Sequence, residues 1–185
     1  VISAGNTGAL LVISKLNLKM IENINKPALS ALWPNKKGMS VVLDLGANIE
    51  CDSKNLVDFS LMGASLYKSL YPNYTPKIAL LNIGSEELKG NEIIKETFQI
   101  LNEKKFKNFD FSGYIEGNQL MDGNVNVIIS DGFTGNVALK TAEGTANFIT
   151  DELKMIFKGS ILGKISAILN YSNFCLLYTS DAADD

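Results

Sequence analysis

Two glycine-rich turns in this sequence have the residue types of an anion-binding site. They read GNTG at residues 5–8 and GFTGN at residues 132–136, and each precedes apolar residues at helical spacing. Glycine lets the backbone approach a ligand closely, and the first N–H groups of a helix carry partial positive charge. Two such helix ends directed at one point can hold a phosphate-sized anion. The alternative is that the glycines only shape tight turns and that Asn or Thr caps each helix.

A lysine and several amide side chains fall in comparable turns. Lys89 lies in a glycine-bounded loop just before a helical segment. Its ammonium group can balance the charge of a phosphate or of a developing oxyanion, or it can be a solvated lysine paired with Glu86 or Glu87. The turns contain neither of the common nucleotide-binding glycine patterns. The amide side chains in these turns are Asn6, Asn48, Asn91 and Asn136.

The 185 residues include no histidine, which limits the chemistry that the chain can perform. Serine and cysteine nucleophiles activated by histidine are excluded, as are histidine metal ligands. Glu86 and Glu87 have no further ligands at a telling spacing, so we expect no metal and no cofactor. Inorganic phosphate can itself act as the nucleophile, and phosphorolysis of an acyl group is then a plausible reaction. The net charge of −3 argues against nucleic-acid binding.

A strand–turn–helix unit that recurs four times would position these residues. Short β-branched runs followed by helical spacing predict a mostly parallel sheet with helices on both faces, a three-layer α/β/α fold. Ligands of such folds bind beyond the carboxyl ends of the strands, so we expect the four turns to converge. Asp44 and Asp131, each at a strand end, would cap or orient the turns, or act as acid or base. We expect strands at 1–3, 41–45, 77–81 and 125–129, helices at 9–20, 54–70, 91–104 and 136–157, a further strand at 109–114 and an edge strand at 28–32.

The two ends of the sequence differ from the middle. The chain starts without Met, in residues typical of the end of a strand, so we interpret residues 1–174 as an interior part of one domain. Residues 175–185 lack periodicity, and we interpret them as a foreign tail or a truncation scar. The two cysteines form no disulfide pattern, which suits the cytoplasm. The amphipathic segment 151–171 could be a dimer face, a cover for the core or an interfacial membrane helix.

Four stretches of the sequence carry a family resemblance. ISAGNTGAL, LDLGAN, LLNIGSEELKGNE and SDGFTGNVALKTAEG, in this order and spacing, resemble the bacterial PlsX-type phosphate acyltransferases. The resemblance implies a Rossmann-like fold of the isocitrate dehydrogenase and phosphotransacetylase type. It also implies a homodimer that makes acyl phosphate from long-chain acyl-[acyl carrier protein] and inorganic phosphate, early in phospholipid synthesis. It assigns catalysis to Lys89 and Asn136, and substrate or phosphate binding to Gly5, Asn6, Thr7, Gly8, Asn48, Asn91, Gly132, Thr134 and Gly135.

The resemblance also bears on the membrane and on the ends of the chain. Family members associate peripherally with membranes through hydrophobic helices, which would correspond to residues 156–169 here. An N-terminal Asp-Ala-Met-Gly-Gly-Asp motif of the family is absent, and from Cys175 onward the sequence departs from the family pattern. Two alternatives remain open: a phosphate acetyltransferase-like enzyme that uses acyl-coenzyme A, and a non-catalytic phosphate-binding module on the same fold.

Overall fold

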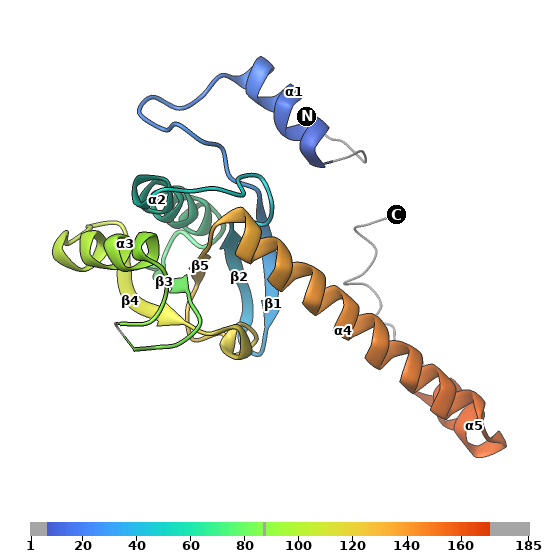
Figure 1. Ribbon diagram of the computed structural model, residues 1–185. Coiled ribbons are helices and arrows are strands. Elements are labelled where there is room, and N and C mark those ends of the chain that lie inside the picture. Colours follow the sequence, from blue (N-terminus) through green and yellow to red (C-terminus); the bar gives the residue numbers. More distant parts are fainter. Residues whose placement is uncertain (1–6, 87, 171–185) are drawn as a thin grey trace. The chain divides into compact units, whose positions relative to one another are not determined.

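The computed structural model describes residues 7–86 and 88–170 (Figure 1). These residues divide into two compact units, Thr7–Leu139 and the described residues from 140 onward. The strand expected at residues 1–3 and the tail expected at 175–185 lie outside the described residues. The elements are α1 (Thr7–Leu18), β1 (Ser30–Asn35), β2 (Gly38–Leu43), α2 (Ser53–Leu70), β3 (Lys77–Leu81), α3 (Glu92–Glu103), β4 (Asp110–Ile115), the 3₁₀ helix η1 (Gly117–Gln119), β5 (Val127–Ile129), α4 (Gly132–Lys158) and α5 (Ile161–Leu169).

In the described part of the chain, five strands form one sheet in the order β1-β2-β5-β3-β4. The edge strand β1 is antiparallel to β2, and all the other neighbouring strands pair in parallel. The carboxyl ends of β2, β5 and β3 therefore lie at the same edge of the sheet. This arrangement confirms the mostly parallel α/β sheet with flanking helices that the sequence predicts.

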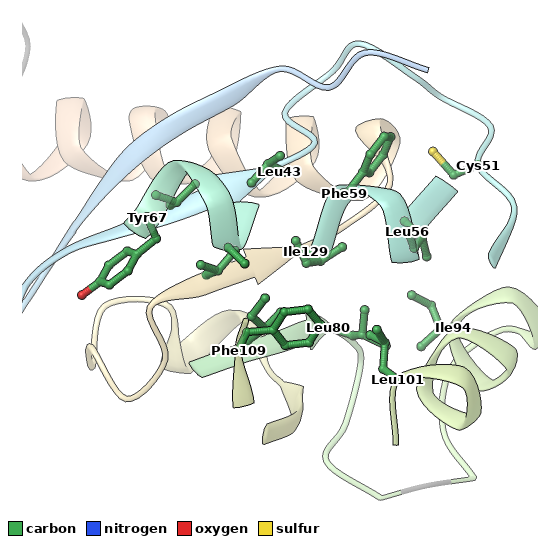
Figure 2. Close-up of a cluster of buried hydrophobic side chains, with 14 residues drawn as sticks. Leu43, Cys51, Leu56, Phe59, Tyr67, Leu80, Ile94, Leu101, Phe109 and Ile129 are labelled. Atoms are coloured by element: carbon green, nitrogen blue, oxygen red, sulfur yellow. The ribbon is translucent and has the colours of Figure 1, made fainter. Parts of the chain in front are cut away.

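The main hydrophobic core lies between the sheet and the helices α2 and α3. Strand residues alternate between faces, and those of one face, including Leu43, Leu80 and Ile129, join α2 and α3 in a single buried cluster. Figure 2 shows Phe59 of α2 against this strand face, with Leu101 of α3 in the same cluster. The opposite face carries Val42, Ala79 and Ile128, which are also buried.

Local polar contacts decide where α2 and α3 begin. The Asp52 carboxylate accepts a hydrogen bond from the Asn55 N–H at 2.7 Å, and the Asn55 side chain accepts one from the Asp52 N–H, which forms a capping box. The Asn91 side chain caps α3 by accepting from the Ile94 N–H at 2.9 Å. The helices predicted at 54–70 and 91–104 are therefore confirmed to within a residue or two.

Some boundaries predicted from the sequence are wrong: β1 ends at Asn35 rather than at residue 32, and β2 begins at Gly38 rather than at residue 41. Helix α4 begins at Gly132 rather than at residue 136, because the Asp131 carboxylate accepts from the Thr134 N–H at 2.8 Å and so starts the helix at once. The end predicted for this helix at residue 157 is confirmed to within one residue, and the amphipathic segment 151–171 is shared between two helices. Helix α4 ends at Lys158, and the Ser160 hydroxyl caps a new helix, α5, by accepting from the Gly163 N–H at 2.9 Å.

Candidate functional site

A cavity of about 510 Å³ lies beyond the carboxyl ends of the strands. Three segments line it: the loop between β2 and α2 with the first turn of α2, the first turn of α3, and the junction of β5 with α4. These segments are far apart in the sequence. The turn at residues 132–136 lines the cavity itself, residues that follow the turns at 46–48 and 82–90 also line it, and the meeting of all four turns stays a prediction. The lining residues are Ile49, Glu50, Cys51, Leu56, Asn91, Ile93, Ile94, Asp131, Phe133 and Thr134.

The fully buried Asp44 carboxylate organises the loop after β2. Its Oδ1 accepts from the Leu29 N–H at 3.0 Å, the Gly46 N–H at 3.2 Å and the Ala47 N–H at 2.9 Å. Its Oδ2 accepts from the Asn48 N–H at 2.8 Å and from the Asn48 side-chain amide at 2.7 Å. Five N–H donors on one carboxylate hold the loop in a single shape, so of the roles expected for Asp44 the structure shows that of orienting the loop.

Close backbone packing joins this loop to the first turn of α4. The Gly132 N–H donates to the Asn48 carbonyl at 2.8 Å. A Cβ atom on Gly132 would lie 2.6 Å from the same carbonyl oxygen, and a Cβ on Gly135 would meet the Asp44 carbonyl even more closely. Both glycines are buried. The extra glycines of this turn therefore serve the close approach of two backbones.

Asp131 occupies the amino end of α4 that the sequence analysis assigned to an anion. Its Oδ1 accepts from the Thr134 N–H at 2.8 Å and its Oδ2 from the Thr134 hydroxyl at 2.8 Å. The capping role expected for Asp131 is therefore confirmed. A phosphate bound at this helix end would share the donors of Thr134 with a carboxylate.

Lys89 lies in the loop that links β3 to α3, outside the lining of the cavity. The buried Asn82 side chain closes this loop by donating to the Gly84 carbonyl at 3.1 Å and to the Lys89 carbonyl at 3.0 Å. The Lys89 ammonium group pairs with the Glu86 carboxylate at 2.9 Å, and half of the lysine side chain is exposed. The hydrogen bond from Lys89 holds the pKa of Glu86 below its usual value, and Glu86 raises the pKa of Lys89. The ammonium group is therefore charged and open to solvent on one side.

The other residues predicted for the site have different surroundings. Asn91 and Thr134 line the cavity. The Asn48 amide donates to Asp44 and to the Pro27 carbonyl at 2.6 Å, so it fixes its own loop. Asn136 is exposed in the first turns of α4 and lies against Gly46. Gly5 and Asn6 fall outside the described residues, and Thr7 and Gly8 begin α1, so the meeting of this first turn with the others stays a prediction.

Sequence reasoning missed the apolar part of the cavity and the role of Asn82. Leu56, Ile94 and Cys51 belong both to the cavity lining and to the buried cluster, and Figure 2 shows them together at one end of that cluster. Burial is the main cause that raises the pKa of the Cys51 thiol, which therefore stays neutral near pH 7. The isolated position of Asn82, directly after an apolar strand, is the one sequence signal that points to its role.

The part of the chain that the structure describes contains neither a candidate metal site nor a candidate membrane-spanning helix. No group of three or more potential ligands there could hold a metal ion. Within the same residues, no helix combines the length and apolar character that crossing a bilayer requires.

The fold is a phosphotransacetylase-like α/β fold. The EutD phosphotransacetylase from Staphylococcus aureus superposes with a TM-score of 0.59 over 80% of this chain and 49% of that protein. The sequences are 15% identical, so this likeness shows the fold alone.

Sequence comparison narrows the class to a family. A model of the family described as "Fatty acid synthesis protein" matches residues 1–179, and the chain belongs to this family. It is 78% identical, over 94% of its length, to a protein named phosphate acyltransferase from Pelagibacter ubique. A protein of the same name from Caulobacter vibrioides is 46% identical over 91% of the chain. The chain spans about half the length of these relatives, 52% of the first and 46% of the second.

Proposed function

We propose that this chain forms part of a phosphate acyltransferase that moves a long-chain acyl group from acyl-[acyl carrier protein] to inorganic phosphate. A phosphate oxygen attacks the thioester carbonyl, a C–O bond forms and the C–S bond breaks. The carrier leaves as a thiolate, which takes up a proton. The product is an acyl phosphate, an activated acyl donor for phospholipid synthesis. The observation that carries this proposal is the 78% identity to a phosphate acyltransferase over 94% of the chain.

The proposed reaction needs no nucleophile from the protein, and the cavity suits such a reaction. Phosphate at neutral pH is itself a competent nucleophile, so the protein has to hold it and stabilise the charge on the attacked carbonyl. The amino ends of α3 and α4 meet at the cavity, where Asn91 and Thr134 provide polar groups. Because of the family resemblance we assign charge stabilisation to Lys89 and the orientation of phosphate or the thioester carbonyl to Asn136, two residues that lie outside the lining of the cavity. The glycines at positions 132 and 135 give the backbone its close packing there.

The direct test measures acyl phosphate as hydroxamate, with the complete reading frame that carries this sequence. Acyl-carrier-protein and acyl-coenzyme A thioesters are compared at equal concentration. Product formed faster from the carrier-protein thioester supports the proposal. The phosphotransacetylase-like fold favours a second candidate, an enzyme that uses acyl-coenzyme A, and the opposite preference would support it. Phosphate binding without any product would indicate a binding module.

The role of Lys89 is tested by substitution. We expect Lys89→Ala to lower turnover at least tenfold, because the loss of one group that stabilises developing charge typically costs that much or more. Lys95→Ala is the matched control, since Lys95 is also paired with a carboxylate three residues away, Glu92, at 3.2 Å. Equal turnover in the two variants would remove Lys89 from the mechanism.

We further propose that the protein works in the cytoplasm as a homodimer bound peripherally to the membrane surface. Helix α5 and the second half of α4 support this, because they expose large apolar side chains: Phe148, Ile149, Met155, Ile156, Ile161, Leu162, Ile165, Ile168 and Leu169. Such helices can lie in a lipid interface or pack against a second copy. The double substitution Ile161→Asp and Ile165→Asp should reduce sedimentation with anionic phospholipid vesicles. Unchanged sedimentation with a loss of dimer in size-exclusion chromatography would assign the surface to the dimer alone.

A further inference from the structure

The cavity beyond the strands is lined by two chemically different sets of residues, called here its polar side and its apolar side. The polar side consists of Glu50, Asn91, Asp131 and Thr134. The other lining residues form the apolar side, which has a buried floor and an exposed rim. The floor consists of Leu56, Ile94 and Cys51, which are all buried, and the neutral thiol adds no charge to it.

The rim of the apolar side is exposed to solvent in the structure. Ile49 is 71% exposed, Phe133 63% and Ile93 37%. They come from three separate segments, the β2–α2 loop, the first turn of α4 and the first turn of α3, yet they surround one cavity. Large apolar side chains gathered at a concave surface mark a binding site for an apolar group.

We propose that this apolar wall holds the hydrocarbon part of the acyl substrate, and that Ile49, Ile93 and Phe133 set the acyl-chain preference. The proposal rests on the function proposed above. Phosphate is an anion, and a thioester carbonyl accepts hydrogen bonds, so both gain from the polar side of the cavity. The hydrocarbon chain is the one part of the reacting groups that gains from an uncharged, apolar surface.

Apolar and polar lining residues come from the same two helix starts. Ile93 follows Asn91 by two residues at the start of α3, and Phe133 directly precedes Thr134 at the start of α4. A substrate with a polar and an apolar part can therefore contact both sets of residues in one cavity. The volume of about 510 Å³ lies within the usual range for small-molecule sites.

The experiment compares acyl phosphate formation from donors of different chain length in the complete reading frame. Hexadecanoyl and butanoyl thioesters of the same carrier are assayed with the unsubstituted enzyme, Phe133→Ala and Ile49→Ala. Both side chains are more than half exposed, so truncating them leaves the buried cluster intact. We expect kcat/KM for the hexadecanoyl donor to fall about tenfold in each variant, since the loss of an apolar contact in a binding pocket has effects of that order. The butanoyl donor should change less than twofold.

Ile83→Ala is the control, because Ile83 is 80% exposed, lies in the loop after β3 and does not line the cavity. It should leave the ratio of the two rates unchanged. An equal loss for both donors in Phe133→Ala and Ile49→Ala, or the same change of ratio in Ile83→Ala, would overturn the assignment of the acyl wall. A different result would refute the proposed function: the unsubstituted enzyme would form no acyl phosphate from any donor. The assignment of the acyl wall would then be refuted as well.

Discussion

The contact between Gly135 and the Asp44 carbonyl predicts that Gly135→Ala lowers the free energy of unfolding. A change from glycine to alanine within a helix usually raises it. A Cβ at position 135 would come far inside 3.0 Å of the Asp44 carbonyl oxygen and within 2.6 Å of the Ser130 hydroxyl oxygen. The first of these is backbone held by the hydrogen bonds of the Asp44 loop, so it cannot rotate away. The first turn of α4 must move, and with it the polar side of the cavity.

The magnitude follows from two opposing terms. Replacing glycine by alanine inside a helix stabilises it by about 1 kcal/mol from helix propensity alone. Forcing an extra carbon into a tightly packed site costs about 3 kcal/mol. We therefore expect Gly135→Ala to lower the free energy of unfolding by about 2 kcal/mol. Displacement of the helix end by about 1 Å can also cost on the order of a hundredfold in turnover.

The measurement is urea unfolding of the complete reading frame, followed by circular dichroism, together with acyl phosphate formation. Gly144→Ala is the control in the same helix, because nothing lies within 4 Å of a Cβ at that position. It should raise stability slightly and leave turnover unchanged. If Gly135→Ala were as stable and active as Gly144→Ala, the close approach of Asp44 and α4 would be refuted as the reason for glycine there.

Three further predictions concern carboxylates and the buried thiol. Asp131→Asn keeps a capping oxygen but removes a negative charge beside the proposed phosphate, and the repulsion removed is worth about 1 kcal/mol. KM for phosphate should therefore fall about fivefold. A higher KM would show that phosphate binds elsewhere. Asp44→Asn should cost about 3 kcal/mol in urea unfolding, because five donors lose a charged acceptor, whereas the exposed Asp110→Asn should cost almost nothing. Burial raises the pKa of Cys51, so the unfolded chain loses that proton first, and stability should fall as pH rises above the ordinary thiol value of 9.0. Cys51→Ala should make this pH dependence shallower, and an unchanged slope would contradict the assignment.

Local signals were sufficient for most elements of the sheet and the core-facing helices. The bounds of β3 agree with the prediction because an apolar run lies between Pro76 and Asn82, which both mark its ends. Helix α3 agrees because a capping asparagine precedes strongly periodic apolar positions. The start of α4 was misplaced because glycine and threonine after a strand are typical of a loop. Their place within the helix depends on Asp131 and on backbone contacts to the loop after β2, which no local pattern reveals.

The candidate site was predictable in place but not in detail. Parallel strands bring their carboxyl ends to one edge, and this rule brought Asn91 and Thr134 to the same cavity. The rule does not say which polar side chains remain available to a ligand. The side chains of Asn48 and Asp44 are hydrogen-bonded to each other within their loop, and the Lys89 ammonium group is paired with Glu86. The apolar rim went unnoticed because Ile49 and Phe133 are isolated hydrophobic residues within polar stretches.

The position of β5 has a consequence for how the molecule is made. Within the described residues it follows β1 to β4 in chain order, yet it lies in the middle of the sheet, between β2 and β3. As the polypeptide leaves the ribosome, β2 and β3 each have an unpaired inner edge until residues 127–129 emerge. Such edges can pair with other chains or bind chaperones. Asp131 and Thr134 follow directly on the same stretch. Insertion of this three-residue strand thus joins β2 to β3 and brings Asp131 and Thr134 to the cavity in the same step.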